Sequence, residues 1–557
     1  MSTERPTRAA RIRSAARELL PARADYAPLR RTWRGDLLAG LTVGIVALPL
    51  ALGFGISSGA GAEAGIITAI VAGIVAAVFG GSNVQVSGPT GAMVVVLAPI
   101  VASHGLGAVA LVSVLAGVIV LVAGVLRLGR AVSFIPWPVI EGFTLGIAVI
   151  IFLQQVPALT RADVAGASHT NVVITAVEDL ARAEPVYLLW AVGAVAIVAA
   201  CMLLLPRLHR AIPGSLVGIA VVTLLSLVLP SPLADIGELP SSLPAPALPA
   251  FDAALLGELA LPALTVAALA AIESLLAARV AASLADTGAY QPDRELVGQG
   301  LASVAAGLFG GMPATGAIAR TAVSVRAGAR TRVAAVTHAI VLLVIVLVAA
   351  QPVGLIPLAA LSGVLMVTAV RMVHLATVRS ILRSTRADAV AFVVTAIVTI
   401  SVDLIVAVVI GIVVAGVFAI RGLSRATGVT REAIAGDPVE GDERIAVIRL
   451  DGPLFFAAAD RVHDTVTSLD EVSVVILRMS QLELVDATGA HVLSEIVRRL
   501  EARGITVLIK GVQEGHIELF RTVGVLAALR DHRHLFSSLM TAVEHARSHI
   551  ARERAAG

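Results

Sequence analysis

The stretch SGPTGAM, residues 87–93, interrupts a long run of Ala, Val, Leu, Ile and Gly. Ser, Gly and Pro end helices more readily than they extend them, and a broken helix in lipid leaves backbone groups without partners. Ser87 is a good N-cap residue and Pro89 suits the first helical turn. The stretch therefore predicts a helix that begins near residue 88 and continues through AMVVVLAPI, within an apolar region.

The composition of the whole chain places this break in a membrane. Of the 557 residues, 57% are hydrophobic and 15% are charged, and the mean hydropathy is +0.91. Between about residues 37 and 424, apolar runs near the ~20 residues that cross a bilayer follow one another, and we count about twelve to fourteen of them. The expected class is a polytopic membrane protein.

Arginine-rich flanks predict the orientation of the chain. The N-terminal tail, residues 1–36, has nine Arg, four acidic residues and no apolar core. The exit from the membrane part carries Arg421 and Arg425. Because cytoplasmic flanks carry an excess of Arg and Lys, we expect both termini in the cytoplasm, in a multi-pass protein of the cell's inner (plasma) membrane.

Several function classes are not indicated. No basic patch is interleaved with aromatic residues, so no nucleic-acid partner is expected. The chain has no GxxxxGK[ST], HExxH or GxSxG motif, which argues against ATP-driven transport and against common hydrolases. The single Cys201 allows neither a disulfide framework nor a cysteine metal site. We expect no enzyme activity, no catalytic residue, no cofactor and no metal site.

The composition changes sharply after about residue 424. Residues 425–441 are polar, contain Gly and Pro, and are interpreted as a linker. From 442 to about 550, the segments IAVIRL, SVVILRM and ITVLIK have the pattern of buried strands, and amphipathic helical segments separate them. This order predicts a small α/β domain with a parallel sheet, placed in the cytoplasm because it follows a cytoplasmic exit.

The membrane part, residues 37–424, contains an internal echo. GLFGGMPATGAIA (307–319) resembles AVFGGSNVQVSGPTGAM (77–93), and Thr90 and Thr315 are 225 residues apart. Matched, interrupted apolar segments in two halves of a chain indicate a secondary transporter with internal repeats. The repeats would cover about 37–235 and 258–424, and seven spans in each would make them inverted. Chance similarity in a Gly/Ala-rich chain is the alternative.

The two breaks together predict an anion site. The second break contains Pro313 and predicts a helix that begins near residue 314. Each helix start leaves free N–H groups and about half a positive charge, and irregular backbone at membrane depth lines a cavity or is buried in protein. Two starts facing each other would bind an anion without a cationic side chain. A kink closed by neighbouring helices is the alternative. The candidate binding residues are Ser87, Gly88, Pro89, Thr90 and Gly91 in the first break and Thr315, Gly316 and Ala317 in the second.

Two charged residues of the membrane part join this hypothesis. Arg320 lies five residues past Thr315 in an apolar helix, where a charge is costly enough to suggest function. It would hold the anion or tune the field of the site, unless it snorkels to the membrane surface. Glu273, in LTVAALAAIESLLAA, is the most isolated carboxylate of the membrane part. It would carry a proton or help to hold a cation, unless it is a neutral structural group.

Long motifs resemble the sulfate permease (SulP) family of anion transporters. They are PLALGFGISSGAGAEAGIITAIVAGIVAAVFGGS (49–82), VSGPTGAM, AIESLLAARVAASLADT (271–287) and ELVGQGLASVAAGLFGGMPATGAIARTAVSVRAGA (295–329). In the C-terminal part, VVILRMSQLELVDATGAHVL resembles a STAS domain. Two positions depart from the family pattern: Leu50 stands where the family has Gln after Pro49, and Ala319 stands where Ser commonly precedes the Arg.

This resemblance implies an all-α membrane domain of fourteen spans, built as two inverted repeats of seven, followed by the STAS domain. It also implies a core that moves like an elevator against a gate, a homodimer, and an anion held at the half-helix starts 87–90 and 314–317. Arg320 matches the family's motif Arg, and Glu273 matches the acidic residue tied to proton or sodium coupling. A cytoplasmic partner of the STAS domain is also possible within this resemblance.

The motif pattern looks closest to bacterial members that carry dicarboxylates such as fumarate or succinate with protons. We therefore expect proton-coupled symport of a dicarboxylate. Alternatives are a sulfate or bicarbonate transporter coupled to protons or sodium, and an uncoupled, channel-like member. A nucleobase permease and a membrane-tethered signalling scaffold are further alternatives from other classes.

Overall fold

The computed structural model describes residues 18–130, 135–160, 172–209, 212–240, 242–249, 253–284, 286–288, 290–402, 404–434 and 437–556. The first seventeen residues of the expected cytoplasmic tail therefore lie outside the described residues. The chain divides into two compact units, Met1–Ile412 and Val413–Gly557, and each is considered by itself.

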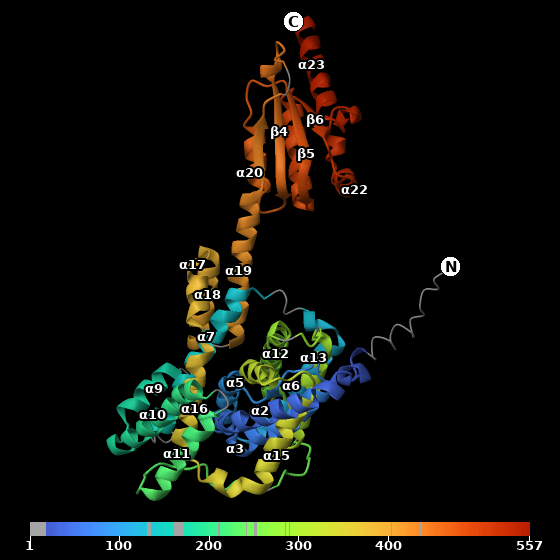
Figure 1. Ribbon diagram of the computed structural model, residues 1–557. Helices are drawn as coiled ribbons and strands as arrows, with labels where there is room; N and C mark the ends of the chain where they lie inside the picture. The colour runs from blue at the N-terminus through green and yellow to red at the C-terminus, as the bar shows by residue number, and fades with distance from the viewer. Residues whose placement is uncertain are drawn as a thin grey trace, which may run out of the picture. The chain divides into compact units, whose positions relative to one another are not determined.

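The first unit is helical (Figure 1). Its first half contains η1 (Arg23–Tyr26), α2 (Leu29–Ser57), α3 (Gly61–Ile67), η2 (Thr68–Ala72), α4 (Gly73–Phe79), β1 (Ser87–Gly88), α5 (Gly91–His104), α6 (Gly107–Val125), α7 (Trp137–Leu153), α8 (Val156–Thr160), α9 (Val172–Ala181), α10 (Pro185–Leu208) and α11 (Gly214–Val228). Its second half contains α12 (Ala253–Leu284), α13 (Pro292–Leu308), β2 (Thr315–Gly316), α14 (Ile318–Arg326), α15 (Val333–Gly354), α16 (Leu358–Met372), α17 (Leu375–Arg383) and α18 (Arg386–Ser401), and α19 (Leu404–Ala426) runs on into the second unit.

Nine helices in the described part of the chain are long and apolar enough to cross a membrane, and α5 and α11 are shorter apolar helices. The count of fourteen spans stays a prediction. The first span is longer than expected, because α2 begins at Leu29 and the last eight residues of the expected tail are helical. A π-helical turn, η2, joins α3 and α4 into one apolar segment, Gly61–Phe79.

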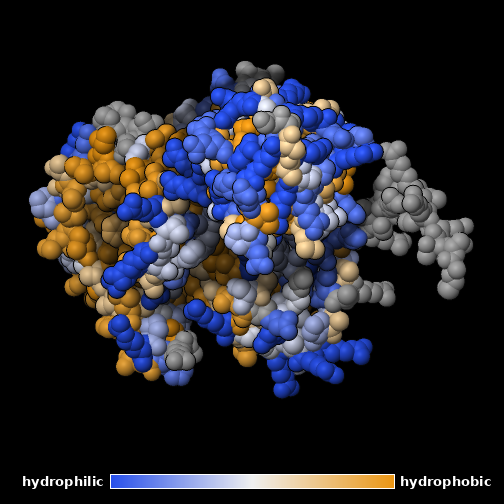
Figure 2. Space-filling model, turned by 90° about the horizontal axis from the view of Figure 1, so that it is seen from above, coloured by the Kyte–Doolittle hydropathy of each residue, from blue (hydrophilic) through white to orange (hydrophobic). Residues whose placement is uncertain are grey.

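The helices of this unit pack in two groups. One contains α2 to α6 and α12 to α15, and its main pairs are α6 with α13 and α2 with α15; the other contains α7, α10, α11, α16 and α18. Glycine brings paired helices close together: a Cβ at Gly300 would lie 2.5 Å from Leu121 N. Such small-residue contacts are typical of helix packing in lipid. Figure 2 shows hydrophobic surface gathered at the left, where α10 and α11 lie in Figure 1.

The second unit is a five-stranded sheet covered by helices. Its elements are β3 (Gly428–Glu432), η5 (Asp442–Arg444), β4 (Ile445–Leu454), α20 (Ala459–Thr467), β5 (Val474–Val485), α21 (Ala487–Ala502), β6 (Thr506–Lys510), α22 (Glu514–Val523), η6 (Leu526–Ala528), η7 (His532–His534), β7 (Leu535–Phe536) and α23 (Leu539–Ala556). The strand order is β3-β4-β5-β6-β7, and β4 to β7 are parallel. The expected strands are thus β4, β5 and β6.

Alternating side chains of the strands face opposite layers of helices. Ala446 and Ile448 contribute to one core with α20 and α21, while Ile445 and Val447 contribute to a second core with α23. The segment 425–441, interpreted from the sequence as a linker, differs from that interpretation. It contains β3, an edge strand that pairs antiparallel with β4, because its alternating residues find a partner that polarity alone does not reveal.

Candidate anion site at two broken helices

The two breaks are joined by a short antiparallel ladder. β1 pairs with β2, with Ser87 opposite Gly316 and Gly88 opposite Thr315. One further backbone bond extends the contact, since Ala317 N donates to Val86 O at 2.8 Å. The echo seen in the sequence thus corresponds to two segments that lie side by side at the centre of the unit. All the residues of the ladder are buried.

Both helices begin later than the sequence predicted. α5 begins at Gly91 with Thr90 as its N-cap, and α14 begins at Ile318 with Ala317 as its N-cap. The predicted starts near 88 and 314, with Ser87 as the first cap, are wrong. The reason is that the residues expected to cap the helices are extended instead and satisfy their backbone groups in the ladder.

The first turns of both helices keep free donors. Val94 N bonds to Thr90 O and Thr321 N bonds to Ala317 O, which are the first intrahelical bonds. Neither helix has a side-chain cap. Within the described part of the chain, the backbone N–H groups of 91–93 and 318–320 have no hydrogen-bond partner. Two sets of unpaired N–H groups with the positive end of a helix dipole are therefore present.

Arg320 adds a cation to these donors. Its side chain is 2% exposed, so it does not snorkel to a surface. Nη2 donates to Pro89 O at 2.5 Å and thereby connects α14 to the first break. Nη1 is buried and has no hydrogen-bond partner. A buried guanidinium with an unused donor is costly unless an acceptor completes it.

Gly88 is required beside this guanidinium. Its φ is +149°, a conformation that side chains rarely adopt. A Cβ there would lie 2.8 Å from Arg320 Nη1 and 3.3 Å from Ala69 Cα. Gly91 fits closely in a different way, since a Cβ would lie 2.1 Å from Ile151 Cδ1 of α7. Gly88 therefore makes room for the cation, whereas Gly91 makes room for a neighbouring helix.

Glu273 of α12 lies at the same place. Thr90 Oγ1 donates to Glu273 Oε2 at 2.8 Å, which links the carboxylate to the cap of α5. Glu273 also interacts electrostatically with Arg320. On the next position of the same helix, Ser274 Oγ accepts from Gly316 N at 3.0 Å. One turn of α12 thus contacts both breaks.

A buried polar network behind β1 was not anticipated from the sequence. Gln299 Nε2 lies 2.5 Å from Ser87 Oγ and 2.9 Å from Glu295 Oε1. Gln85 Nε2 donates to the same Glu295 oxygen at 2.8 Å, and the other oxygen accepts from Gly81 N at 2.8 Å. The sequence gave one signal: an acid and an amide spaced i, i+4 in ELVGQG face the same side of a helix.

Hydroxyl groups also anchor the second break. Thr68, in the π-helical turn η2, accepts from Met312 N at 2.8 Å. Ser303 Oγ accepts from Ala314 N at 3.2 Å. Because π turns occur often at functional sites, this contact is a signal that local sequence patterns do not carry. The backbone of the break is thus held by side chains from three other elements.

His338 of α15 is a further polar residue that sequence reasoning missed. It is fully buried, and neither ring nitrogen has a hydrogen-bond partner. It interacts electrostatically with Arg320, and its Cε1 is 3.8 Å from a Cβ placed on Gly73. A single His in an apolar helix gave no pattern to distinguish it from a core residue.

A second charged cluster lies away from the breaks and is internally paired. Arg294 Nη2 bonds to Asp25 Oδ2 at 2.6 Å, and Arg332 Nη1 donates to Gly80 O at 2.6 Å. Burial alone would raise the pKa of Asp25, but the hydrogen bond from Arg294 and the charge of Arg332 outweigh it, so this pKa lies below its ordinary value. These arginines have a structural role, in contrast to Arg320.

The fold and the site together define a class. A mostly helical membrane unit with paired, broken helices, followed by a small α/β unit, is the architecture of membrane anion transporters that carry an appended cytoplasmic-type domain. The class rests on the buried backbone breaks and on the order of the two units along the chain.

The chain belongs to the sulfate permease family. Residues 33–395 match the model of that family, and residues 438–542 match the STAS domain. The putative sulfate transporter YvdB of Bacillus subtilis is 35% identical over 505 residues, covering 88% of this chain and 93% of its own. The bicarbonate transporter BicA of Synechocystis is 32% identical, covering 86% and 88% respectively.

Solved structures agree on the fold. The transmembrane domain of a cyanobacterial bicarbonate transporter BicA has a TM-score of 0.60 and 33% identity, and covers 69% of this chain and 98% of its own. The murine Solute Carrier 26 family member A9 anion transporter in the inward-facing state has a TM-score of 0.84 and 18% identity, covering 98% and 97%. The expected dicarboxylate branch is not supported, since these relatives are named as sulfate or bicarbonate transporters.

Proposed function

We propose that the protein carries a small inorganic oxyanion, bicarbonate or sulfate, across the membrane, and that it binds this anion between the N-termini of α5 and α14. The observation that carries the proposal is Arg320 Nη1, a buried cationic donor without a partner, beside two helix starts with free N–H groups. Charge-assisted bonds from a guanidinium and backbone N–H groups suit a compact oxyanion.

The charge of the site favours a compact anion over a dicarboxylate. Arg320 is the one cationic side chain that the described residues place at the two helix starts, and one of its nitrogens is already used by Pro89 O. The two carboxylates of fumarate or succinate are separated by a carbon chain and would call for a second cationic group. The names of the relatives point the same way.

Glu273 links the anion to a cation. A carboxylate that accepts from Thr90, the N-cap of α5, places negative charge beside the anion site. A proton on Glu273, or a sodium ion beside it, removes this repulsion, so the anion and the cation bind together. Transport is then symport, driven by the gradient of that cation.

Movement of one helix group past the other would carry the site across the membrane. The group of α2 to α6 and α12 to α15 contains every proposed binding residue, and α7, α10, α11, α16 and α18 form the other group. We assign the first group to the core and the second to the gate of an elevator, in a homodimer of fourteen-span chains. By the positive-inside rule, both termini face the cytoplasm of an inner-membrane protein, where the STAS domain would meet any partner.

The test is uptake into proteoliposomes. Purified protein is reconstituted, and labelled bicarbonate, sulfate, fumarate, succinate and chloride are offered with and without imposed proton or sodium gradients. We expect uptake of bicarbonate or sulfate that rises with one of the two cation gradients. Uptake of dicarboxylates in preference to both oxyanions would restore the dicarboxylate interpretation.

Two other outcomes would overturn parts of the proposal. Oxyanion flux that ignores both gradients would identify an uncoupled, channel-like protein and remove the role of Glu273. Uptake inhibited by uracil and not by anions would identify a nucleobase permease. Transport by a chain lacking residues 430–557, with loss of the cellular phenotype, would favour the signalling scaffold.

A further inference from the structure

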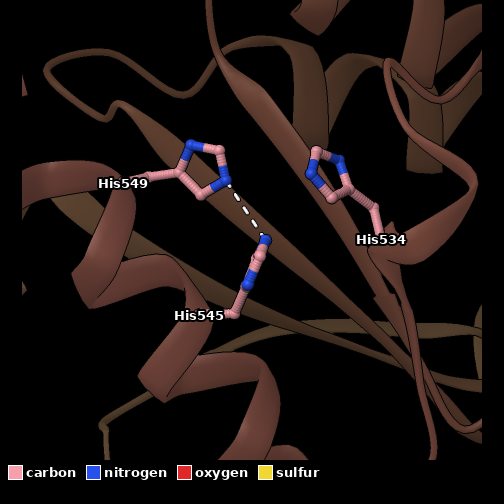
Figure 3. Close-up of side chains that lie close together, drawn as sticks. All are labelled: His534, His545 and His549. Carbon is pink, nitrogen blue, oxygen red and sulfur yellow. Dashed lines mark hydrogen bonds between the residues drawn. The ribbon is translucent and has the colours of Figure 1, made fainter. Parts of the chain in front are cut away.

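Three histidines of the second unit meet at one place. His534 ends η7, just before the edge strand β7, while His545 and His549 lie one turn apart on α23. The ring centroids of His534 are 5.5 Å from those of both His545 and His549, and the latter two rings are 4.9 Å apart. Figure 3 shows that one ring nitrogen of each histidine faces the space between the three rings.

The distances fit a shared metal ion. His545 Nε2 and His549 Nε2 are 3.2 Å apart, and two imidazoles on a tetrahedral zinc ion, with bonds near 2.0–2.1 Å, would be about 3.3 Å apart. One nitrogen from each of the three rings lies within 4.8 Å of the others. A rotation of the His534 ring by a side-chain torsion would bring the third nitrogen into the same sphere.

The burial of His534 needs an explanation. Its side chain is 4% exposed, and its Nδ1 has no hydrogen-bond partner. The other nitrogen of its ring faces the two histidines of α23 (Figure 3). A buried ring whose polar atoms are not satisfied by protein groups is costly. A metal ion bonded to the inward nitrogen would repay that cost.

The geometry points to a binding site for a divalent transition-metal ion, best suited to zinc, formed by His534, His545 and His549. Neutral imidazole nitrogens are preferred by zinc, copper and nickel, whereas magnesium and calcium prefer oxygen. Three nitrogen ligands leave a fourth tetrahedral position open. His545 and His549 are partly exposed, so water or a side chain of another molecule can fill this position.

The metal would fasten the last helix to the sheet. α23 already packs on one face through Val543 and Ala546, and β7 joins the sheet through two residue pairs with β6. An ion bonded to both α23 and the η7–β7 segment adds a link that the unfolded chain lacks. Binding should therefore raise the unfolding temperature of this unit. The site stands apart from the anion site and is independent of the proposed transport.

The experiment titrates zinc alone into the full-length protein in detergent, purified without a polyhistidine tag and stripped with chelator. We expect one zinc ion per chain with micromolar or tighter affinity in calorimetry, and d–d absorption bands of tetrahedral intensity when cobalt replaces zinc. The double variant His545→Gln, His549→Gln should lose affinity by about 100-fold or more and lose the cobalt bands.

A matched variant controls for nonspecific histidine binding. His532 lies two residues from His534, and its side chain is 91% exposed, so His532→Ala should bind zinc as the parent does. Equal stoichiometry and affinity in the parent and the double variant would overturn the proposal. Equal losses in the His532→Ala and double variants would overturn it as well. His534→Gln, which keeps most of the ring volume, gives a second loss variant if the double variant does not fold.

Discussion

The two helix starts at the candidate site share a backbone and differ in chemistry. The first start, before α5, has Thr90 as its cap, and the buried residues of its helix are apolar. The second, before α14, has a nine-residue helix whose buried residues are Arg320, Thr321 and Ser324. The cation is therefore supplied once, from the second start, and reaches across to Pro89 of the first.

This difference shows what the repeated break supplies. The extended pair and the late helix start occur in both halves, because both are needed to present free N–H groups. A guanidinium in each half would place two like charges in the same buried space, which is costly. The repeat thus sets the backbone, and the side chains assign a cation to one half and a coupled carboxylate, Glu273, to the other through Thr90.

Removing the cation should break the comparison most strongly. We expect Arg320→Gln to weaken anion uptake by about 100-fold or more, because the buried charged donor is lost while the backbone remains. Uptake at several anion concentrations in proteoliposomes measures the effect. Arg320→Lys should recover part of the activity, since it keeps the charge and loses the fork.

Arg326 gives the control for this experiment. It lies in the last turn of the same helix and is exposed. Arg326→Gln should leave uptake within about twofold of the parent, because exposed charges contribute little. Equal losses in the two variants would mean that α14 only needs arginine for folding, and that Arg320 is not a binding residue.

Neutralising the carboxylate should separate coupling from binding. We expect Glu273→Gln to bind the anion and to lose about 10-fold of the gradient-driven accumulation, since an amide takes up neither a proton nor sodium charge. The measurement is uptake with and without the cation gradient, with exchange of internal for external anion as the control for folding. The full gradient dependence of the parent in this variant would remove Glu273 from the mechanism.

The two capping threonines should differ in a smaller way. Thr90 bonds to Glu273 at 2.8 Å, whereas Thr315 Oγ1 makes a long bond of 3.4 Å to Gly316 O. We expect Thr90→Val to lower coupled uptake by about 5-fold, the worth of one neutral hydrogen bond, and Thr315→Val to lower it by less than about 2-fold. Equal effects, or a larger effect at Thr315, would contradict the unequal roles of the two halves.

Paired arginines in the second unit give the smallest expected effect on transport. Glu432 bonds to Arg478 at 2.7 Å and to Arg449 at 2.9 Å. Burial alone would raise its pKa, but the bonds from Arg478 and Arg449 outweigh it and hold the pKa below the ordinary value of 4.5. The pair therefore stabilises the fold above about pH 4.5, and this contribution is lost as the pH falls through the lowered pKa.

Hydrogen exchange of the full-length protein measures this effect. We expect Glu432→Gln to lower the local opening free energy of β3 and β4 by about 1 kcal/mol at pH 7 and to leave anion uptake unchanged. The difference between variant and parent should vanish at a pH below the lowered pKa. A difference that persists there would show that the packing of the side chain, and not its charge, is what matters.

The sequence predicted the existence of the site better than its geometry. Pro89, Pro313 and the neighbouring glycines mark both breaks, because these residues have strong local effects on the backbone. Capping rules then chose Ser87, since they consider only contacts near in sequence. The ladder with Gly316 decides the actual start, and it joins residues more than two hundred positions apart.

The same limit explains the other differences. Glu295 and Gln85 meet across a sequence separation that no local pattern crosses, and His338 has no neighbour in the sequence that marks it. The three histidines were missed because only cysteine spacing was weighed for metals, although His545 and His549 have the i, i+4 spacing that places two ligands on one helix face. β3 was missed because its partner follows it in the chain.

The ladder between β1 and β2 has a consequence for how the protein is made. Ser87 leaves the ribosome 228 residues before Thr315, which at about 5–20 residues per second means a wait of roughly 10–45 seconds. During that time the first break sits in or near the membrane with its backbone groups unpaired. A transcript that stops between the halves would yield a product that cannot complete this pairing, and such a product should be a substrate for membrane quality control.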